Sequence, residues 1–398
     1  RRSAAVKVVV VGAGIFGATA ALALRRRGHD VSLVDPGPLP HPDAASTDVS
    51  KVIRADYGSD VFYTQLMEQA LPRWRSDPIL SRYFHETGLA ILSAAPLVAG
   101  SFELESHATL TARGHQLELL DAERIAARFP AWRPGRFQAG YYNPQGGWAE
   151  SGAATLAVAE AALAAGVTHV PRAARAIAAG ARAGVQLSDD SALTADRIVV
   201  AAGAWTRALL PELADRLVAL GQPVTFFRAA APDLLSPPRF VPFTADVALT
   251  GLYGLPCNAE GLVKIAHHGE GVPLDTASPN PSSRSADGVE AFFRAFLRDS
   301  LPALATAPLE RTRLCLYSDS FDGDLFICPH PARDGVVVAS GGSGHAFKLA
   351  PVLGDLIADV VGGQPPRERF AWRAVGARRR EAARSLDELR RDEMRGSE

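Results

Sequence analysis

Three glycines with the spacing Gly-x-Gly-x-x-Gly stand near the start of the chain, in the segment Gly12-Ala13-Gly14-Ile15-Phe16-Gly17. Such glycines allow a tight turn, a close approach of backbone N–H groups to a pyrophosphate, and close packing of the following helix. Asp35 lies where an acid accepts hydrogen bonds from the ribose hydroxyls of an adenosine and disfavours a 2′-phosphate. The motif predicts a dinucleotide site, without separating FAD from NAD.

A second glycine-rich segment, Gly341-Gly342-Ser343-Gly344-His345, stands between an apolar strand and an apolar helix. The backbone N–H groups at a helix N-terminus carry a positive pole of roughly half a unit charge. That pole suits the C2 carbonyl edge of a flavin, where negative charge collects on reduction. On its local sequence, the segment is equally compatible with an ordinary glycine-rich crossover.

Lysine is scarce in this arginine-rich chain, whose only lysines are Lys7, Lys51, Lys264 and Lys348. A lysine kept in such a chain points to a need for a compact ammonium instead of a planar guanidinium. Strand alternation in GLVKIAHH puts Lys264 on one face with Leu262, Ala266 and His268. We expect a water or a cofactor beside this ammonium, because an unpaired buried charge is costly. A lysine at a strand edge is the alternative.

The three cysteines, Cys257, Cys315 and Cys328, are too few for a disulfide framework and lack the spacing of a metal site. Cys315 shares a strand face with Arg313 and Tyr317, which is unusual for a core cysteine. A thiolate, the form favoured by a nearby cation, would be nucleophilic there. From local features alone a structural cysteine is the simpler interpretation, and we interpret Cys257 and Cys328 that way.

The elements that must position these residues begin with a βαβ unit. An apolar strand at 7–11 is typical of a strand covered on both faces, and a helix to about Arg27 and a strand at 30–34 follow it. Buried strands are also expected at about 195–206, 311–317 and 335–340. Helices are predicted at about 61–76, 121–128, 151–165 and 376–393, and after residue 288, where the core-facing stripe is Val289, Phe292, Phe293, Phe296 and Leu297.

This order predicts an α/β (α+β) fold with two domains. A Rossmann-like dinucleotide-binding domain is assembled from the discontinuous segments 1–84, 149–218 and 321–378. An inserted antiparallel β-sheet domain, which would bind substrate, comprises 85–148 and 219–320. Residues 379–398 are expected to form a charged C-terminal helix or tail.

Composition narrows the function classes. The 398 residues are 47% hydrophobic and 21% charged, as in globular proteins, and contain no apolar run of about 18 residues; from the early start of the first strand we expect no signal peptide. A formal net charge of −1 gives no general attraction for nucleic acid. We therefore expect a cytoplasmic enzyme with no nucleic-acid or membrane partner and no metal.

Several segments, in this order, resemble the FAD-dependent amine oxidases of the D-amino-acid oxidase superfamily. They are GAGIFG, SKVIRADYG (50–58), VVAAGAWT (199–206), LYGLP followed by LVK (252–264), LCLY (314–317) and SGGSGHAFKLAP (340–351). The resemblance spans about 5–362 and is strongest to the monomeric sarcosine oxidase branch, with its fructosyl-amino-acid, pipecolate, saccharopine and N-methyltryptophan oxidases. It implies a monomer that oxidises the C–N bond of an amino acid or N-substituted amino acid, giving an imine and, from oxygen, hydrogen peroxide.

The resemblance also implies roles for single residues. Arg54 and Lys348 match the pair that holds the substrate carboxylate, Lys264 the lysine that promotes reaction with oxygen, and Cys315 the cysteine that forms a thioether to FAD. Pocket positions are matched by His268, Tyr253 and Tyr317. The implied cofactor-binding residues are Gly12, Gly14, Ile15, Phe16, Gly17, Asp35, Ser46, Ser50, Lys51, Cys315, Gly342, Ser343, Gly344, His345 and Lys348.

Other interpretations of these residues remain open at this point. Arg54 can be a surface cation, Lys348 can extend from a helix to solvent, and the aromatic and histidine side chains can be packed core residues. Lys51 departs from the sarcosine oxidases, which carry Arg there, and so leaves the substrate subclass open.

Other functions also remain open. A flavin dehydrogenase with a non-oxygen acceptor is the main alternative, and Lys264 argues against it. An FAD-dependent enzyme acting on a tRNA base is disfavoured because no basic tract with interleaved aromatics is present.

Overall fold

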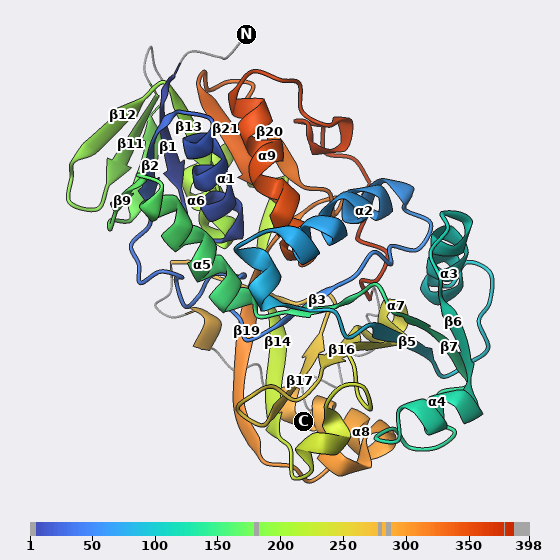
Figure 1. Ribbon diagram of the computed structural model, residues 1–398. Coiled ribbons are helices and arrows are strands. Elements are labelled where there is room, and N and C mark those ends of the chain that lie inside the picture. The colour runs from blue at the N-terminus through green and yellow to red at the C-terminus, as the bar shows by residue number, and fades with distance from the viewer. Residues whose placement is uncertain (1–4, 179–182, 278–280, 284–287, 378, 386–398) are drawn as a thin grey trace.

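The computed structural model describes residues 5–178, 183–277, 281–283, 288–377 and 379–385, and two large sheets organise them (Figure 1). The first sheet is parallel except at its β20–β21 edge. Its spatial order is β20 (Phe326–Pro329), β21 (Val336–Ser340), β13 (Arg197–Val200), β1 (Lys7–Val11), β2 (Asp30–Val34) and β9 (Thr168–Val170). Strand β1 is central, and its carboxyl end leads directly into the Gly12 turn.

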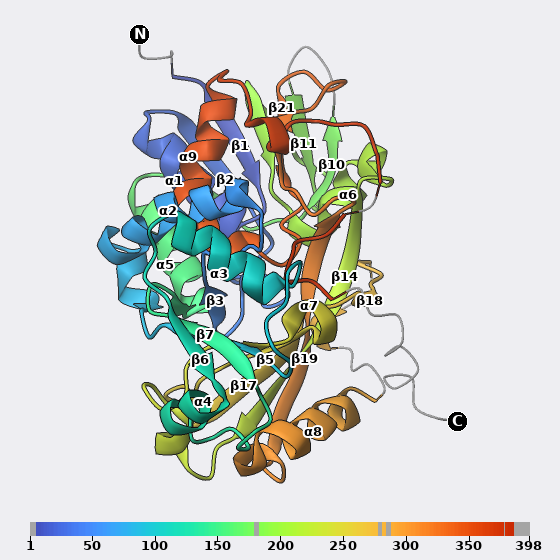
Figure 2. The same ribbon diagram turned by 90° about the vertical axis from the view of Figure 1, so that its right-hand side faces the viewer.

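The second sheet is antiparallel apart from its β15–β5 pair. Its order is β18 (Val272–Pro273), β14 (Leu217–Arg228), β17 (Leu262–His267), β16 (Leu252–Leu255), β15 (Phe243–Ala245), β5 (Leu89–Ser93), β7 (Ala139–Asn143) and β6 (Glu118–Asp121). Strand β19 (Leu309–Ser320) also pairs with β14, and these two long strands run from near α6 down to α8 (Figure 2).

Two small sheets complete the strands. One is formed by β10 (Ala174–Ala178), β11 (Ala183–Leu187) and β12 (Ala192–Ala195), and the other by β3 (Lys51–Ile53), β8 (Gly147–Ala149) and β4 (Phe84–His85). The α-helices are α1 (Ile15–Arg26), α2 (Val61–Ser76), α3 (Phe102–Ala112), α4 (Ala122–Arg128), α5 (Ser151–Ala164), α6 (Thr206–Leu209), α7 (Val247–Thr250), α8 (Val289–Ser300) and α9 (Ala350–Val361).

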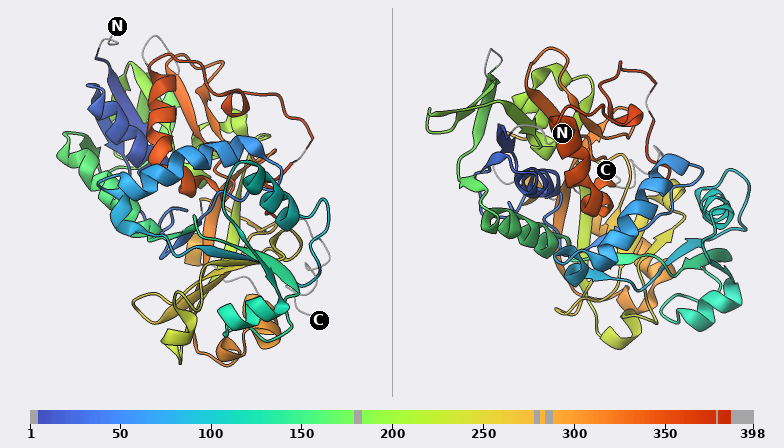
Figure 3. Two further views of the ribbon diagram at one scale, coloured as in Figure 1. Left: turned by 45° about the vertical axis from the view of Figure 1, so that its right-hand side comes forward. Right: turned by 45° about the horizontal axis from the view of Figure 1, so that its top comes forward.

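Strand β1 shows that the first sheet is covered on both faces, as its all-apolar sequence predicted. Val8 and Val10 belong to the core shared with α1 and α9. Val9 and Val11 belong to a separate core with residues of β11. Figure 3 shows α1 and α9 lying together over one face of the sheet. Alternate residues of one strand therefore fill two different layers.

Strand β17 divides the second sheet in the same way. Val263 and Ile265 belong to the core that includes the predicted apolar stripe of α8. Leu262 and Ala266 face the other way, into a cluster with residues of β19. By the alternation of the strand, Lys264 shares this second face.

Most predicted elements are confirmed. The helices expected at 61–76, 121–128, 151–165 and after 288 are α2, α4, α5 and α8. Helix α3 was not predicted, because FELESHATLTA has no continuous apolar stripe. Its signals were the capping residue Ser101, whose side chain accepts from Leu104 N, and acidic residues in the first turn. No helix among the described residues is long and apolar enough to cross a lipid bilayer.

The helix predicted at 376–393 is wrong for its described part, because residues 376, 377 and 379–385 are turns and irregular chain. Glu381, Ala383, Arg384 and Ser385 are buried instead of solvated. The dense charge of this stretch indicated a surface helix, but in the structure its charged side chains pair with buried partners. The remainder of the predicted helix, 386–398, lies outside the described residues.

Gly354 provides a test of how tightly α9 packs on α1. A Cβ atom added at Gly354 would lie 2.4 Å from the backbone oxygen of Thr19. A backbone atom cannot swing aside as a side chain can, so Gly354→Ala should cost about 1–3 kcal/mol of stability. The midpoint of urea unfolding measures the loss. The control is Gly376→Ala, where the added atom meets nothing within 4 Å; equal midpoints for both variants would contradict the tight contact.

Candidate active site

A cavity of about 520 Å³ lies at the carboxyl ends of the parallel strands. Ten of the fifteen residues predicted to bind the cofactor line it: Gly12, Gly14, Ile15, Phe16, Asp35, Ser46, Lys51, Gly342, Ser343 and Gly344. Gly17, Ser50, Cys315, His345 and Lys348 do not line the cavity itself. Tyr317 lines it from the second sheet, so both large sheets contribute to its wall.

The first glycine motif forms one end of this cavity. Gly12 has φ +98°, and a Cβ there would lie 2.5 Å from the carbonyl oxygen of Ala201. Gly17 permits helix packing, since its Cβ would clash with the Gly12 backbone. The carboxylate of Asp35 accepts from the backbone N–H groups of Ala13 at 2.8 Å and Gly37 at 2.9 Å. These bonds fix the carboxylate and leave each oxygen a second lone pair, so the end fits an adenosine dinucleotide.

The second glycine motif lies against β19. Gly344 has φ +77°, and a Cβ there would lie 2.1 Å from the ring of Tyr317, so only glycine fits. The Ser343 hydroxyl contacts Ser320, which ties the loop to the end of β19. Helix α9 begins only at Ala350, after a 3₁₀ turn. The predicted N-terminus of a helix is therefore displaced by several residues from the glycines that line the cavity.

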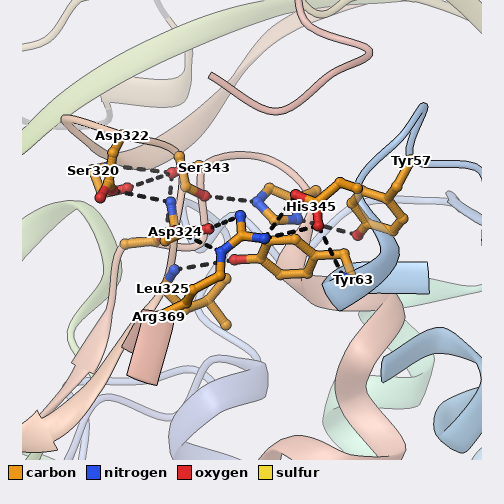
Figure 4. A network of polar contacts seen from close by, with 12 residues as sticks. Tyr57, Tyr63, Ser320, Asp322, Asp324, Leu325, Ser343, His345 and Arg369 are labelled. Carbon is orange, nitrogen blue, oxygen red and sulfur yellow. Dashed lines mark hydrogen bonds and ion pairs between the residues drawn. The ribbon is translucent and has the colours of Figure 1, made fainter. Parts of the chain in front are cut away.

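His345 points away from the cavity, into the network of Figure 4. Its Nε2 lies 2.9 Å from the carbonyl oxygen of Gly323, and its Nδ1 lies 3.1 Å from the hydroxyl of Tyr57. Burial lowers the pKa of His345 to about 3, so the ring is neutral at neutral pH. Because a carbonyl only accepts, Nε2 carries the proton and Nδ1 accepts from Tyr57. His345 positions Tyr57.

Lys264 lies in a buried charge cluster behind the cavity wall. Its Nζ is 2.6 Å from Oδ2 of Asp48 and 2.7 Å from the carbonyl oxygen of Ser50. The Nζ of Lys51 lies 3.7 Å from the same carboxylate and 3.5 Å from Sγ of Cys315. We expected a water or a cofactor beside this ammonium, but its partner is Asp48, an acid of the chain that the sequence analysis did not identify. Asp48 stands three residues before Lys51, and that spacing was the available signal.

Electrostatics keep this cluster ionised. Burial alone would raise the pKa of Asp48, but the charges of Lys264, Lys51 and Arg313 hold it well below its usual range. Burial lowers the pKa of Lys264, and the contact with Asp48 opposes that shift. A carboxylate and an ammonium at 2.6 Å satisfy each other, since removing either one would leave a buried unpaired charge.

Arg54 and Lys348 come together at a second centre, as predicted. Both cations lie over the ring of Tyr57, with Arg54 Cζ at 5.2 Å and Lys348 Nζ at 4.5 Å from its centroid. Arg54 Nη2 lies 2.7 Å from Oε1 of Glu381, whose Oε2 is 3.2 Å from Nε2 of His268. All of these side chains are buried. An anion of the chain thus occupies the place predicted for a substrate carboxylate.

The pKa values at this centre follow from burial and mutual charge. Burial, and then the charge of Arg54, hold the pKa of Lys348 well below its usual value. Burial would raise the pKa of Glu381, but Arg54, His268 and Lys348 hold it well below its usual range. Burial lowers the pKa of His268, so its ring is neutral at neutral pH. Glu381 was missed because its surroundings in the sequence looked like a solvated helix.

The remaining predicted pocket residues connect the two centres. The Tyr317 hydroxyl lies 3.5 Å from Nδ1 of His268. Tyr253, on β16, packs in the cluster that contains Cys315 and Tyr317. The structure therefore brings the predicted residues together around one wall of the cavity. They form two separate charge centres, one at Lys264 and one at Arg54.

A cavity lined by a glycine-rich βαβ turn and closed by a second sheet defines a dinucleotide-dependent enzyme. The sequence profile of the family described as "FAD dependent oxidoreductase" (DAO) matches residues 7–360. The chain belongs to this family, and it is an FAD-dependent oxidoreductase.

Relatives and solved structures agree with this assignment. The chain is 29% identical to the L-saccharopine oxidase of Schizosaccharomyces pombe, with 92% of each chain covered. It is 30% identical to the peroxisomal sarcosine oxidase of Mus musculus, with 90% of this chain and 92% of the relative covered. The fructosyl peptide oxidase from E. terrenum has the same fold, with a TM-score of 0.83 at 24% identity over 98% of this chain and 97% of that one.

The Asp48–Lys264 pair provides a stability prediction. Asp48→Asn should cost about 3–5 kcal/mol at pH 7, because it leaves a buried ammonium without its counter-charge. The double variant Asp48→Asn/Lys264→Met should recover part of this loss. The pKa of Asp48 is depressed in the folded state. The difference in free energy of unfolding between wild type and Asp48→Asn should therefore be fully present at pH values above the ordinary pKa of aspartate, and it should shrink below about pH 4.

Chemical denaturation across pH measures this effect. The control is Asp190→Asn, at an exposed ion pair with Arg175, which should cost less than about 1 kcal/mol. A loss in Asp48→Asn no larger than in the control would contradict a buried ion pair.

Proposed function

We propose that this protein is an oxidase that removes two electrons and two protons from the CH–NH group of an amino acid with a substituted nitrogen. The products are an imine, which water hydrolyses, and hydrogen peroxide, formed when oxygen takes up the two electrons and two protons. The observation that carries the proposal is the buried pair Arg54 and Lys348, which converge on one aromatic ring close to the cavity. Buried cations at one point attract an anion; Glu381 fills that place in the structure, and a carboxylate is the anion that an amino acid offers instead.

The names of the relatives support the choice of substrate class. Saccharopine and sarcosine are both amino acids with a secondary amine, and the relatives named after them cover almost the whole chain. Arg54 can grip a carboxylate with a fork of two N–H groups, and Lys348 adds a point charge. One of these N–H groups is available, since Nη1 of Arg54 is buried without a hydrogen-bond partner.

The residues around the cavity fit FAD. In our proposal Gly12, Gly14 and Asp35 would hold its adenosine and pyrophosphate, and the 341–344 loop and Tyr317 would contact its flavin. When bound, FAD supplies the two-electron acceptor for the amine and returns these electrons to oxygen. The chain supplies orientation of the substrate and the electrostatic environment. Every residue in this account comes from one chain, and we propose that the protein works as a monomer.

We further propose that Cys315 links covalently to the cofactor. Lys51 places an ammonium 3.5 Å from Sγ, and a cation beside a thiol favours the nucleophilic thiolate. Sγ also lies 3.6 Å from the carbonyl oxygen of Ala45, and both Ala45 and Lys51 line the cavity, so the sulfur lies directly behind its wall. Forming the thioether would release two protons, one from the thiol and one from the flavin methyl group, together with two electrons; oxygen would take up all of these as hydrogen peroxide.

The choice between an oxidase and a dehydrogenase depends on Lys264. We propose that its ammonium favours reaction with oxygen by stabilising negative charge as oxygen is reduced. Asp48 offsets part of that charge, while Lys51 adds a second cation to the same carboxylate. Two ammonium groups share one acid, so the cluster keeps a net positive charge at the cavity wall. A transfer of electrons to a quinone or a protein remains the alternative.

The substrate class is tested with matched amines. Stopped-flow bleaching of the flavin by an N-methyl amino acid should be far faster than by the same compound without its carboxylate. Arg54→Ala should raise the Kd of the amino acid about 30-fold or more and leave the decarboxylated amine almost unaffected. Peroxide formed under air measures the oxidase reaction. Equal efficiency for the two amines in wild type would overturn the carboxylate site, and turnover with an artificial acceptor but no peroxide would favour the dehydrogenase.

The covalent link is tested by acid precipitation. The yellow colour of the wild type should remain with the precipitated chain, whereas Cys315→Ala should release it into the supernatant. Cys257→Ala is the matched control, because Cys257 lies away from this cluster in another core region. Colour that stays bound in Cys315→Ala would show that this sulfur is not the point of attachment.

A further inference from the structure

The last described stretch of the chain, 379–385, is inserted between the two large sheets. In Figure 2 the red chain end descends past α6 toward α7 and β14. The N–H of Arg379 donates to the carbonyl oxygen of Phe321, beside the first sheet, and the N–H of Ser385 donates to that of His268, in the second. The segment therefore spans both sides of the substrate centre.

Buried contacts hold this segment in place. Arg384 pairs with Asp319 at 2.5 Å, and its Nε donates to the carbonyl oxygen of Gly269 at 2.8 Å. The hydroxyl of Ser385 donates to the carbonyl oxygen of Leu249. Ala383 completes an apolar cluster with residues of β5 and β7. The segment is therefore held in the protein by an ion pair, hydrogen bonds and apolar contacts of its own.

Glu381 is the residue that the segment delivers to the centre. Its two carboxylate oxygens contact Arg54 and His268, at 2.7 Å and 3.2 Å. The side chain of Glu381 is 1% exposed. The contact with Arg54 is one that a substrate carboxylate would make under the proposed function. The chain thus presents its own carboxylate to its own carboxylate-binding residues.

Two carboxylates cannot share this site. A substrate carboxylate beside Glu381 would place two negative charges within a buried space where like charges repel strongly. When the substrate binds, Glu381 must therefore leave. Arg54 would not remain unpaired during the exchange, since one carboxylate replaces another.

We propose that the segment 379–385 is an autoinhibitory strap, in which Glu381 occupies the carboxylate site until a substrate carboxylate displaces it. This inference rests on the proposed function and adds a regulation of the same site. It predicts that the wild type binds carboxylates more weakly than its pocket permits, because each ligand must first compete with Glu381.

Propionate, a carboxylate without an amine, is a direct probe of this competition. Its Kd is measured by the change in flavin absorbance when it is titrated into the holoenzyme. Glu381→Gln should bind propionate about tenfold or more tightly than wild type, because a neutral amide neither pairs strongly with Arg54 nor repels the probe. Glu290→Gln is the control, since Glu290 is an exposed acid that pairs with Arg294 within α8, at 3.2 Å, outside the segment 379–385. It should leave the Kd unchanged.

Hydrogen exchange gives an independent readout of the strap. In the inserted state the N–H of Ser385 donates to the carbonyl oxygen of His268, and the N–H of Arg384 donates to the carbonyl oxygen of Glu381 within the strap. Saturating propionate should speed the exchange of both in wild type. If Glu381→Gln does not fold, Arg384→Ala, which removes the anchor at Asp319, serves in its place with the same expected gain in affinity.

The outcomes separate the strap from the function. Propionate binding that is equal or weaker in Glu381→Gln, or a strap whose exchange does not respond, would overturn the strap and leave the proposed function intact. If no variant binds propionate and no amino acid bleaches the flavin, the carboxylate site itself is wrong, and the strap is wrong with it.

Discussion

Buried positive charge needs a buried acid, and this requirement determines how distant segments of the chain meet. Lys264 and Arg54 are both almost fully enclosed, and each has a carboxylate within 2.7 Å. Unpaired, such charges would cost several kcal/mol each. The acids come from segments distant in sequence from the cations that they pair with: Asp48 from the loop before β3, and Glu381 from near the end of the chain. Charge balance therefore links both sheets to the same wall of the cavity.

Three lysines, distributed over the two charge centres, also suggest a reason why lysine is kept in this arginine-rich chain. Lys51, Lys264 and Lys348 are buried or half-buried around one wall, whereas Lys7 is at the exposed start of β1. A guanidinium is wider and would not fit between Asp48 and the Ser50 carbonyl as a compact ammonium does. The scarcity of lysine, a composition bias that usually carries no functional information, was informative here, because three of the four lysines lie at the candidate site.

The sequence predicted the parts of the fold that repeat a local pattern. The strand and glycines of the βαβ unit, and the stripe of α8, each specify their own structure through periodicity and turn chemistry. The residues it missed depend on long-range pairing. Asp48 has no periodicity and no motif around it beyond its spacing from Lys51, and its partner Lys264 is more than 200 residues away. Glu381 stands in a stretch whose charge density alone indicated solvent exposure, and burial by ion pairs leaves no local signature.

The two acids differ in how they are attached. Asp48 lies just before β3, and its buried carboxylate is held by two ammonium groups. Glu381 lies beyond the segment matched by the family profile, which ends at residue 360, and the described residues 379–385 around it form no helix or strand. Such stretches open at lower free energy than sheet cores do. We therefore expect the carboxylate of Asp48 to remain beside Lys264, whereas the carboxylate of Glu381 beside Arg54 can be exchanged for that of a ligand.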